Sequence, residues 1–245
     1  MSRVQLRFYE ELNDFLAPAL RKVDITHTFH RRASVKDMIE SFGVPHTEVD
    51  IILVNGQSVD FSYIVQHGDR ISVYPMFESL DVSPLLRLRP APLRSPAFVL
   101  DTNLGRLARY LRLLGFDCLY QNDYDDDTVA TIADREHRTV LTRDRALLQR
   151  RIITRGYFVR EVRPRLQVKE VLARFDLYRL VAPFSRCIRC NGVLQVVDKQ
   201  SIEARLEPKT RKYFDSFMRC SDCGQIYWQG SHRARSLHLI EELTT

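Results

Sequence analysis

The 245-residue sequence lacks long apolar runs: none approaches the roughly 20 apolar residues that span a bilayer. It also lacks a signal-peptide core, because the N-terminus passes at once into alternating polar and apolar residues. Repeats and low-complexity tracts are missing too. These absences exclude a membrane-spanning or repetitive protein. We therefore expect a cytoplasmic, globular chain with no membrane partner, one or two ordinary domains and room for a small third one.

Basic charge is scarce in the first part of the chain and abundant in the last. Residues 1–80 carry a net charge of −3 and residues 81–149 of zero, whereas residues 150–245 have 19 basic against 10 acidic side chains. A region of this kind favours a polyanionic partner, and nucleic acid above all. A solvated basic surface that binds nothing in particular is the alternative.

Cysteine is also infrequent, but four of the five cysteines form two C-x-x-C pairs. Cys187 and Cys190 are separated from Cys220 and Cys223 by 29 residues, and Cys118 stands alone in an apolar run. Two such pairs predict a closed tetrahedral site for a structural zinc ion, which contributes folding free energy to a segment with little core. An iron–sulfur cluster and a redox dithiol pair are the alternatives.

Residues 1–80 predict a small β-rich domain. Strands are expected at residues 4–8, 25–29, 51–54 and 71–74, with a helix after Ser34 and a tight turn at Asn55-Gly56. Residues 10–20 are a further candidate helix. This order indicates a ubiquitin-like β-grasp domain. Residues 81–96, with four prolines and three arginines, are expected to form a linker.

Residues 97–180 alternate strands and helices, which predicts an α/β domain with a parallel sheet. Strands are expected at residues 97–100, 116–120 and 139–142, and helices at residues 104–114, 127–137 and 166–175. Residues 181–245 contain the cysteine pairs and short strands, and we expect a Cys₄ zinc ribbon there.

Acidic residues follow the expected strands of this α/β domain. Asp101 comes directly after the first strand and Asp144 after the third, and a group of aspartates precedes the second helix. Ligands of open α/β sheets collect beyond the carboxyl ends of the strands, and clustered carboxylates attract Mg²⁺ or Mn²⁺. The alternative is that these aspartates only cap the helices that follow them.

Four segments together resemble the Mut-seven C-terminal RNase family, a PIN-like nuclease domain with a built-in zinc ribbon. They are residues 101–117 (DTNLGRLARYLRLLGFD), 141–145 (LTRDR), 183–192 (PFSRCIRCNG) and 227–232 (YWQGSH). The resemblance covers about 60% of the chain, residues 98–245. Residues 1–80 are similar to the ubiquitin-like domain that is sometimes fused ahead of it.

The resemblance implies RNA cleavage with Mg²⁺ or Mn²⁺ held by Asp101, Asp126 and Asp144. Asp125 and Asp127 are alternatives to Asp126, and Asp123 is a candidate further member. His232 is interpreted either as a general acid or as a structural hydrogen-bonding residue. RNA contacts are expected from the candidate nucleic-acid-binding residues Asn103, Arg106, Arg143, Arg145, Arg186, Arg189, Trp228 and His232.

The leading hypothesis is a metal-dependent ribonuclease whose basic zinc module grips RNA, such as tRNA or another structured RNA. A non-catalytic RNA-binding protein with a vestigial nuclease pocket is the first alternative, and a DNA nuclease is the second. The ubiquitin-like domain lacks a free Gly-Gly end, since Tyr74 is followed by Pro-Met-Phe. We therefore expect it to dock a protein partner or to position RNA, without conjugation or sulfur transfer.

Overall fold

The structure is a computed structural model that describes residues 1–75, 96–228 and 231–244, without the side chains of residues 231–235. The expected linker lies almost wholly outside the described residues. The chain divides into two compact units, one of Met1–Ser95 with Ala130–Phe158 and one of Pro96–Val129 with Val159–Thr245. This division is spatial, and the domain boundaries expected at residues 80, 96 and 180 stay predictions.

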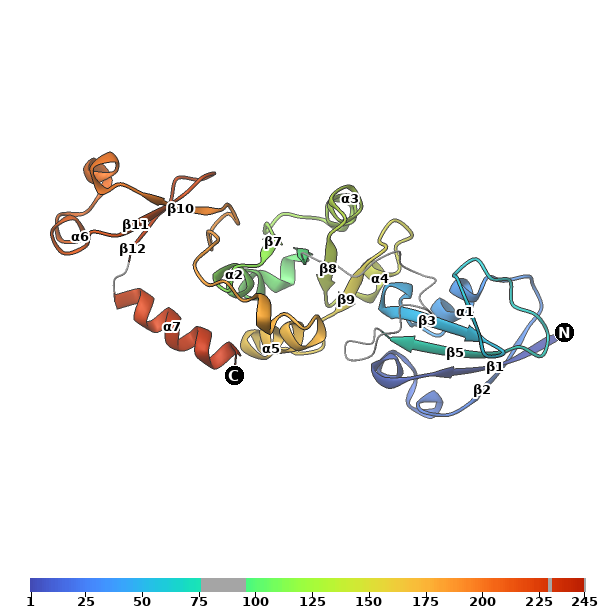
Figure 1. The fold of residues 1–245 in the computed structure, drawn as a ribbon. Coiled ribbons are helices and arrows are strands. Elements are labelled where there is room, and N and C mark those ends of the chain that lie inside the picture. The colour runs from blue at the N-terminus through green and yellow to red at the C-terminus, as the bar shows by residue number, and fades with distance from the viewer. Residues whose placement is uncertain (76–95, 229–230, 245) are drawn as a thin grey trace. The chain divides into compact units, whose positions relative to one another are not determined.

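The N-terminal segment forms a five-stranded mixed sheet in the order β2-β1-β5-β3-β4 (Figure 1). The central pair β1 and β5 is parallel, and the other paired strands are antiparallel. The elements are β1 (Ser2–Phe8), β2 (Ile25–Phe29), α1 (Val35–Ser41), β3 (Val49–Val54), β4 (Gln57–Val59) and β5 (Arg70–Pro75). The expected strand and helix order is confirmed, with the short strand β4 added.

Local sequence explains most of this sheet. Val4, Leu6 and Phe8 alternate with more exposed residues and are buried in one core with α1. Ser34 caps α1 by accepting a hydrogen bond from the Asp37 amide at 3.1 Å. The helix expected at residues 10–20 is wrong in type, because two 3₁₀ turns, η1 (Glu10–Phe15) and η2 (Pro18–Leu20), take its place. Pro18 cannot continue a helix from the preceding turn. A third such turn is η3 (His46–Glu48).

The α/β segment contributes a four-stranded sheet in the order β7-β6-β8-β9. β6 pairs parallel with β7, and β8 pairs parallel with β9. The elements are β6 (Ala97–Leu100), η5 (Thr102–Leu104), α2 (Gly105–Leu113), β7 (Asp117–Leu119), α3 (Asp126–Glu136), β8 (Thr139–Thr142), α4 (Arg145–Leu148), β9 (Gly156–Phe158) and α5 (Pro164–Arg174). The three expected strands and their helices are confirmed, and β9 is a strand that the sequence did not predict.

The cysteine-rich segment forms a three-stranded antiparallel sheet, β10-β11-β12. Its small core contains Ile202, Leu206, Phe217 and Ile226, with Phe214 packed against it. Its elements are β10 (Leu194–Val197), η7 (Lys199–Ser201), η8 (Glu203–Arg205), α6 (Pro208–Tyr213), β11 (Phe217–Cys220), β12 (Ile226–Trp228) and α7 (Ser231–Thr244), and η6 (Tyr178–Leu180) precedes them. The helix α7 was not expected. None of the described helices is long and apolar enough to cross a membrane.

Candidate functional site

The four paired cysteines converge on one point. Their sulfur atoms all lie within 4.8 Å of one another, with 3.6 Å between Cys187 and Cys223 and 3.3 Å between Cys190 and Cys220. Four sulfurs placed tetrahedrally at about 2.3 Å from a zinc ion would be about 3.8 Å apart. The donor set and its spacing therefore fit a structural zinc ion, as the cysteine spacing predicts.

The surroundings of the first cysteine favour the thiolate that a metal needs. Burial opposes ionisation, yet hydrogen bonds from Tyr227 and from backbone amides lower the pKa of the Cys187 thiol to about 7. The Tyr227 hydroxyl lies 3.1 Å from the Cys187 sulfur. Burial also raises the pKa of Tyr227, so this hydroxyl stays protonated and donates to the sulfur.

The loop that carries Cys187 and Cys190, called here the first cysteine knuckle, is joined to strand β7 by hydrogen bonds of Asn191. Its side-chain oxygen accepts a hydrogen bond from the Cys118 amide at 2.9 Å, and its side-chain nitrogen donates to Asp117 at 2.7 Å. Arg186 adds an ion pair to Asp117 at 3.2 Å and donates to the Asn191 carbonyl. Asn191 also has a φ of 76°, a conformation that asparagine tolerates better than most residues.

Replacing Asn191 with Ala is therefore expected to lower the free energy of unfolding by about 2–4 kcal/mol, because the buried Cys118 amide and the half-buried Asp117 carboxylate each lose a hydrogen-bond partner. The measurement is urea unfolding with zinc in excess. Gln200→Ala, at an exposed position, serves as the control. A loss below about 0.5 kcal/mol in Asn191→Ala, the usual range for surface changes, would contradict this role.

Arg112 connects helix α2 to strand β7 and to the loop between Cys187 and Cys190. It is 3% exposed, and it donates to the carbonyls of Cys118 at 2.8 Å and Arg189 at 3.0 Å, with longer bonds to Tyr120 and Ile188. Burial lowers the pKa of this guanidinium, but arginine remains charged at neutral pH. A fixed positive charge thus lies between α2 and the first knuckle.

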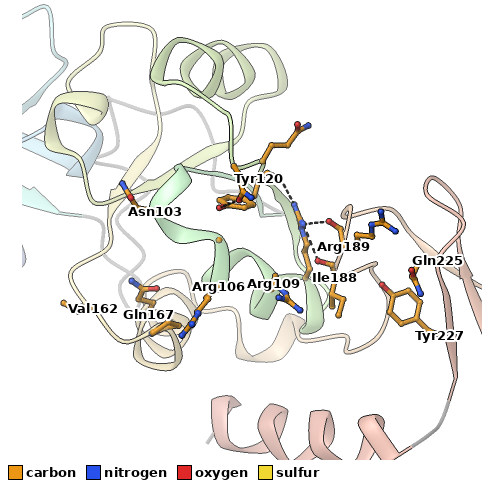
Figure 2. A pocket seen from close by; sticks show the side chains of 15 residues that line it. Asn103, Arg106, Arg109, Tyr120, Val162, Gln167, Ile188, Arg189, Gln225 and Tyr227 are labelled. Atoms are coloured by element: carbon orange, nitrogen blue, oxygen red, sulfur yellow. Dashed lines mark hydrogen bonds between the residues drawn. The ribbon is translucent and has the colours of Figure 1, made fainter.

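A pocket of about 950 Å³ opens beside this charge (Figure 2). None of the fifteen residues that line it is acidic, and four are arginines: Arg106, Arg109, Arg112 and Arg189. Figure 2 shows Arg106 and Arg109 extending from α2, with Gln225 just before β12 and Tyr227 on this strand. Two tyrosines and five side-chain amides complete the polar lining, from Tyr120, Tyr227, Asn103, Gln121, Asn122, Gln167 and Gln225.

The three candidate catalytic acids begin or precede three different helical elements. Asp101 is 7% exposed and precedes η5 without a side-chain capping bond. Asp126 is the exposed first residue of α3, and the preceding Asp125 accepts a bond from the Thr128 amide at 2.8 Å. Asp144 caps α4 by accepting from the Ala146 amide at 2.8 Å. Asp101 and Asp126 belong to one compact unit and Asp144 to the other, so a shared metal site at the three acids stays a prediction.

The candidate RNA-binding residues are found in several places. Asn103, Arg106 and Arg189 line the pocket, whereas Arg186 is engaged with Asp117. Arg145 lies over the rings of Phe15 and Phe158. Arg143 is partly buried after β8, Trp228 is 39% exposed on β12, and the side chain of His232 lies outside the described residues.

Two lining arginines were not among the sequence candidates. Arg109 and Arg112 follow Arg106 at steps of three residues, which places all three on neighbouring positions of one helix face. This spacing could have predicted a basic helix face in the sequence. It is a weak indication, because surface helices often carry basic residues at such intervals.

Two family models match the chain. The Mut7-C RNAse domain matches residues 96–240, and the Mut7-C ubiquitin model matches residues 1–81. No curated protein and no solved structure gives a significant match. The matches confirm the resemblance and the ubiquitin-like N-terminal domain, and the RNAse model covers more than half of the chain. The chain therefore belongs to the Mut7-C RNase family, with the family's ubiquitin-like domain at its N-terminus.

Proposed function

We propose that the protein is a divalent-metal-dependent ribonuclease that hydrolyses RNA phosphodiester bonds. Asp101, Asp126 and Asp144 hold Mg²⁺ or Mn²⁺, and the basic pocket beside the zinc module holds the RNA. The observation that carries this proposal is the pocket itself, which lacks acidic lining residues and contains Asn103, two residues after Asp101. The family match to an RNase domain supports the same reading.

The acids have the chemistry that a hard divalent cation prefers. All three offer carboxylate oxygens, and Asp101 is buried at the end of β6. A bound cation would supply positive charge to stabilise the developing charge on the attacked phosphate. The carboxylates hold and orient that charge, and the arginines of the pocket fix the adjoining phosphates.

We also propose that the α/β domain is PIN-like and that the antiparallel sheet β10-β11-β12 forms a zinc ribbon. Zinc is proposed as the metal of the four cysteines because four thiolates in a closed set suit it best. The ribbon supplies Ile188, Arg189, Gln225 and Tyr227 to the pocket. Zinc therefore shapes the RNA-binding surface without entering the reaction.

Single-stranded RNA is the substrate form that the pocket suits. Its tyrosines offer faces on which unstacked bases can stack, and its side-chain amides can hydrogen-bond to base edges. Single-stranded segments of a larger folded RNA meet the same requirement.

Replacing Arg106 and Arg109 together with Gln is expected to weaken binding of a single-stranded RNA oligonucleotide and to change its salt dependence. Each lost phosphate contact should flatten the slope of log K against log salt by about 0.7, so the pair should flatten it by about 1.4. Binding is measured by fluorescence anisotropy without added Mg²⁺ or Mn²⁺, so that the RNA stays intact.

The matched control is Arg179→Gln with Arg219→Gln, which removes the same charge from exposed positions outside the pocket lining. The control should shift the slope by less than half as much. Equal slopes for the two double variants would show that only net charge matters, and the pocket would lose its assigned role.

The rival function is RNA binding without cleavage. RNA would then bind in the same pocket, but Asp101, Asp126 and Asp144 would hold no catalytic metal. Tight RNA binding that depends on Arg106 and Arg109, with no cleavage under any divalent metal, would favour it.

A further inference from the structure

Three consecutive polar residues of the ubiquitin-like domain are buried against the segment that follows Asp144. His46, Thr47 and Glu48 form η3 and are 5%, 2% and 2% exposed. Each bonds to a backbone group more than 100 residues away in the sequence. Burying three such side chains is costly unless each finds a partner, and here each does.

Two of the three partners are backbone groups at the ends of α4 and β9, and the third, Ile153, lies in the segment between these elements. The imidazole Nε2 of His46 donates to the Ile153 carbonyl at 2.8 Å. The Thr47 hydroxyl lies 3.4 Å from the carbonyl of Leu148, the last residue of α4. The Phe158 amide, at the end of β9, donates to the Glu48 carboxylate. Helix ends and outer strands expose backbone groups that need partners, and η3 supplies them here.

Arg145 extends the same contact at the other end of α4. Its guanidinium lies 5.1 Å from the ring centre of Phe15 and 5.6 Å from that of Phe158, and it approaches the Phe15 carbonyl at 3.4 Å. The two rings meet edge to face, with 5.6 Å between their centres. Phe158 also packs against the hydrophobic core of the ubiquitin-like domain. Arg145, although exposed, is therefore held by cation–π contacts with Phe15 of the ubiquitin-like domain and with Phe158.

These contacts surround a very short helix. α4 has four residues, too few to be stable without tertiary contacts. Asp144 caps its first turn through the Ala146 amide, and the Asp144 amide itself donates to the Thr142 hydroxyl at 2.9 Å. The conformation of Asp144 thus depends on whether α4 is formed, and the ubiquitin-like domain contacts both ends of α4.

We infer that the ubiquitin-like domain acts within its own chain as a clamp that keeps Asp144 in place. Arg145 is then a positioning residue and not an RNA ligand. The contacts of η3 and Arg145 are observed, whereas the effect of the clamp on cleavage rests on the proposed ribonuclease function. Since small displacements of catalytic groups reduce rates strongly, loosening α4 should lower kcat more than it raises KM.

The test compares full-length Glu48→Leu with Glu48→Gln and with Arg145→Lys. Leu removes the acceptor for the Phe158 amide, whereas Gln keeps an oxygen that can accept the same bond. Lys keeps the charge of Arg145 but loses the planar face over Phe15. Asp69→Asn is the control, because Asp69 is a buried acceptor of the same domain that bonds Asn55, Tyr63 and Gln66 away from this contact.

Two readouts are taken from each variant. The first is hydrogen exchange of residues 144–148, which reports the Ala146 amide bond whether or not the protein cleaves RNA. The second is kcat and KM for RNA cleavage with Mn²⁺. We expect Glu48→Leu and Arg145→Lys to speed exchange and to lower kcat about tenfold, with KM changed less than about twofold.

Glu48→Gln should restore protection and kcat, and Asp69→Asn should leave residues 144–148 protected. Unchanged exchange in Glu48→Leu would overturn the clamp, even if the wild-type protein cleaves RNA. Faster exchange with full kcat would remove its catalytic role. Faster exchange in a protein that never cleaves RNA would uphold the clamp and reject the proposed ribonuclease.

Discussion

Asp101→Asn is expected to reduce metal-dependent RNA cleavage by about 10³-fold, since a lost metal ligand removes several kcal/mol of charge stabilisation. The change is isosteric, and Asn keeps a side-chain oxygen that can accept the bond from the Thr102 hydroxyl at 3.2 Å. The thermal midpoint should therefore stay within a few degrees of wild type. The measurement pairs initial cleavage rates with a thermal melt of the same protein.

Asp134→Asn is the matched control. Asp134 is an exposed acid in the last turn of α3, eight residues beyond Asp126, which begins this helix. The Asp134→Asn variant should cleave RNA at the wild-type rate. Full activity in Asp101→Asn would remove this residue from the site, and equal losses in both variants would point to general charge effects.

Cys220→Ser is expected to abolish zinc binding and to unfold the zinc module. Cys220 is 1% exposed, and apparent binding free energies of structural zinc reach about 10–16 kcal/mol in isolated zinc-finger peptides. Zinc content should fall from one ion per chain to nearly none. RNA affinity should fall with it, because Arg189, Gln225 and Tyr227 of the pocket belong to this module.

The companion variant is Cys118→Ala, which removes the lone buried cysteine outside the metal group. It should keep its zinc, and elemental analysis of both variants decides the matter. A Cys220→Ser protein that retains stoichiometric zinc would refute the four-cysteine site. Retained hydrogen-exchange protection over residues 185–228 without zinc would show that the metal is not needed for folding.

The sequence predicted features whose cause is local. The two C-x-x-C pairs predicted one four-sulfur site, and the four sulfur atoms lie within 4.8 Å of one another. Alternating Val4, Leu6 and Phe8 predicted a strand with one buried face, and Ser34 predicted the start of α1. Asp144 follows its strand and caps a helix, which the sequence also suggested. Apart from the convergence of the two cysteine pairs, which lie 29 residues apart, each of these features depends on residues within a few positions of one another.

The missed features depend on contacts between distant residues. β9 has only three residues, too few for an alternating pattern, and it is a strand because β8 lies beside it. Arg112 belongs to a helix whose sequence pattern is amphipathic. It is buried because its guanidinium donates to the carbonyls of Cys118 on β7 and of Arg189, which is more than 70 residues away in the sequence. The bonds of η3 join side chains to backbone groups, which leave no pattern in the sequence.

Metal-dependent cleavage of RNA at the acidic residues is tested by the rate of cleavage as a function of added metal. Zinc-loaded protein is freed of other metals by desalting, because a chelator would also attack the cysteine site. End-labelled single-stranded RNA and DNA of matched sequence are then incubated with increasing Mn²⁺ or Mg²⁺. We predict saturable cleavage of the RNA and far slower cleavage of the DNA. RNA cleavage at full rate without added metal, or no RNA cleavage at any metal concentration, would show that the protein is not a metal-dependent ribonuclease.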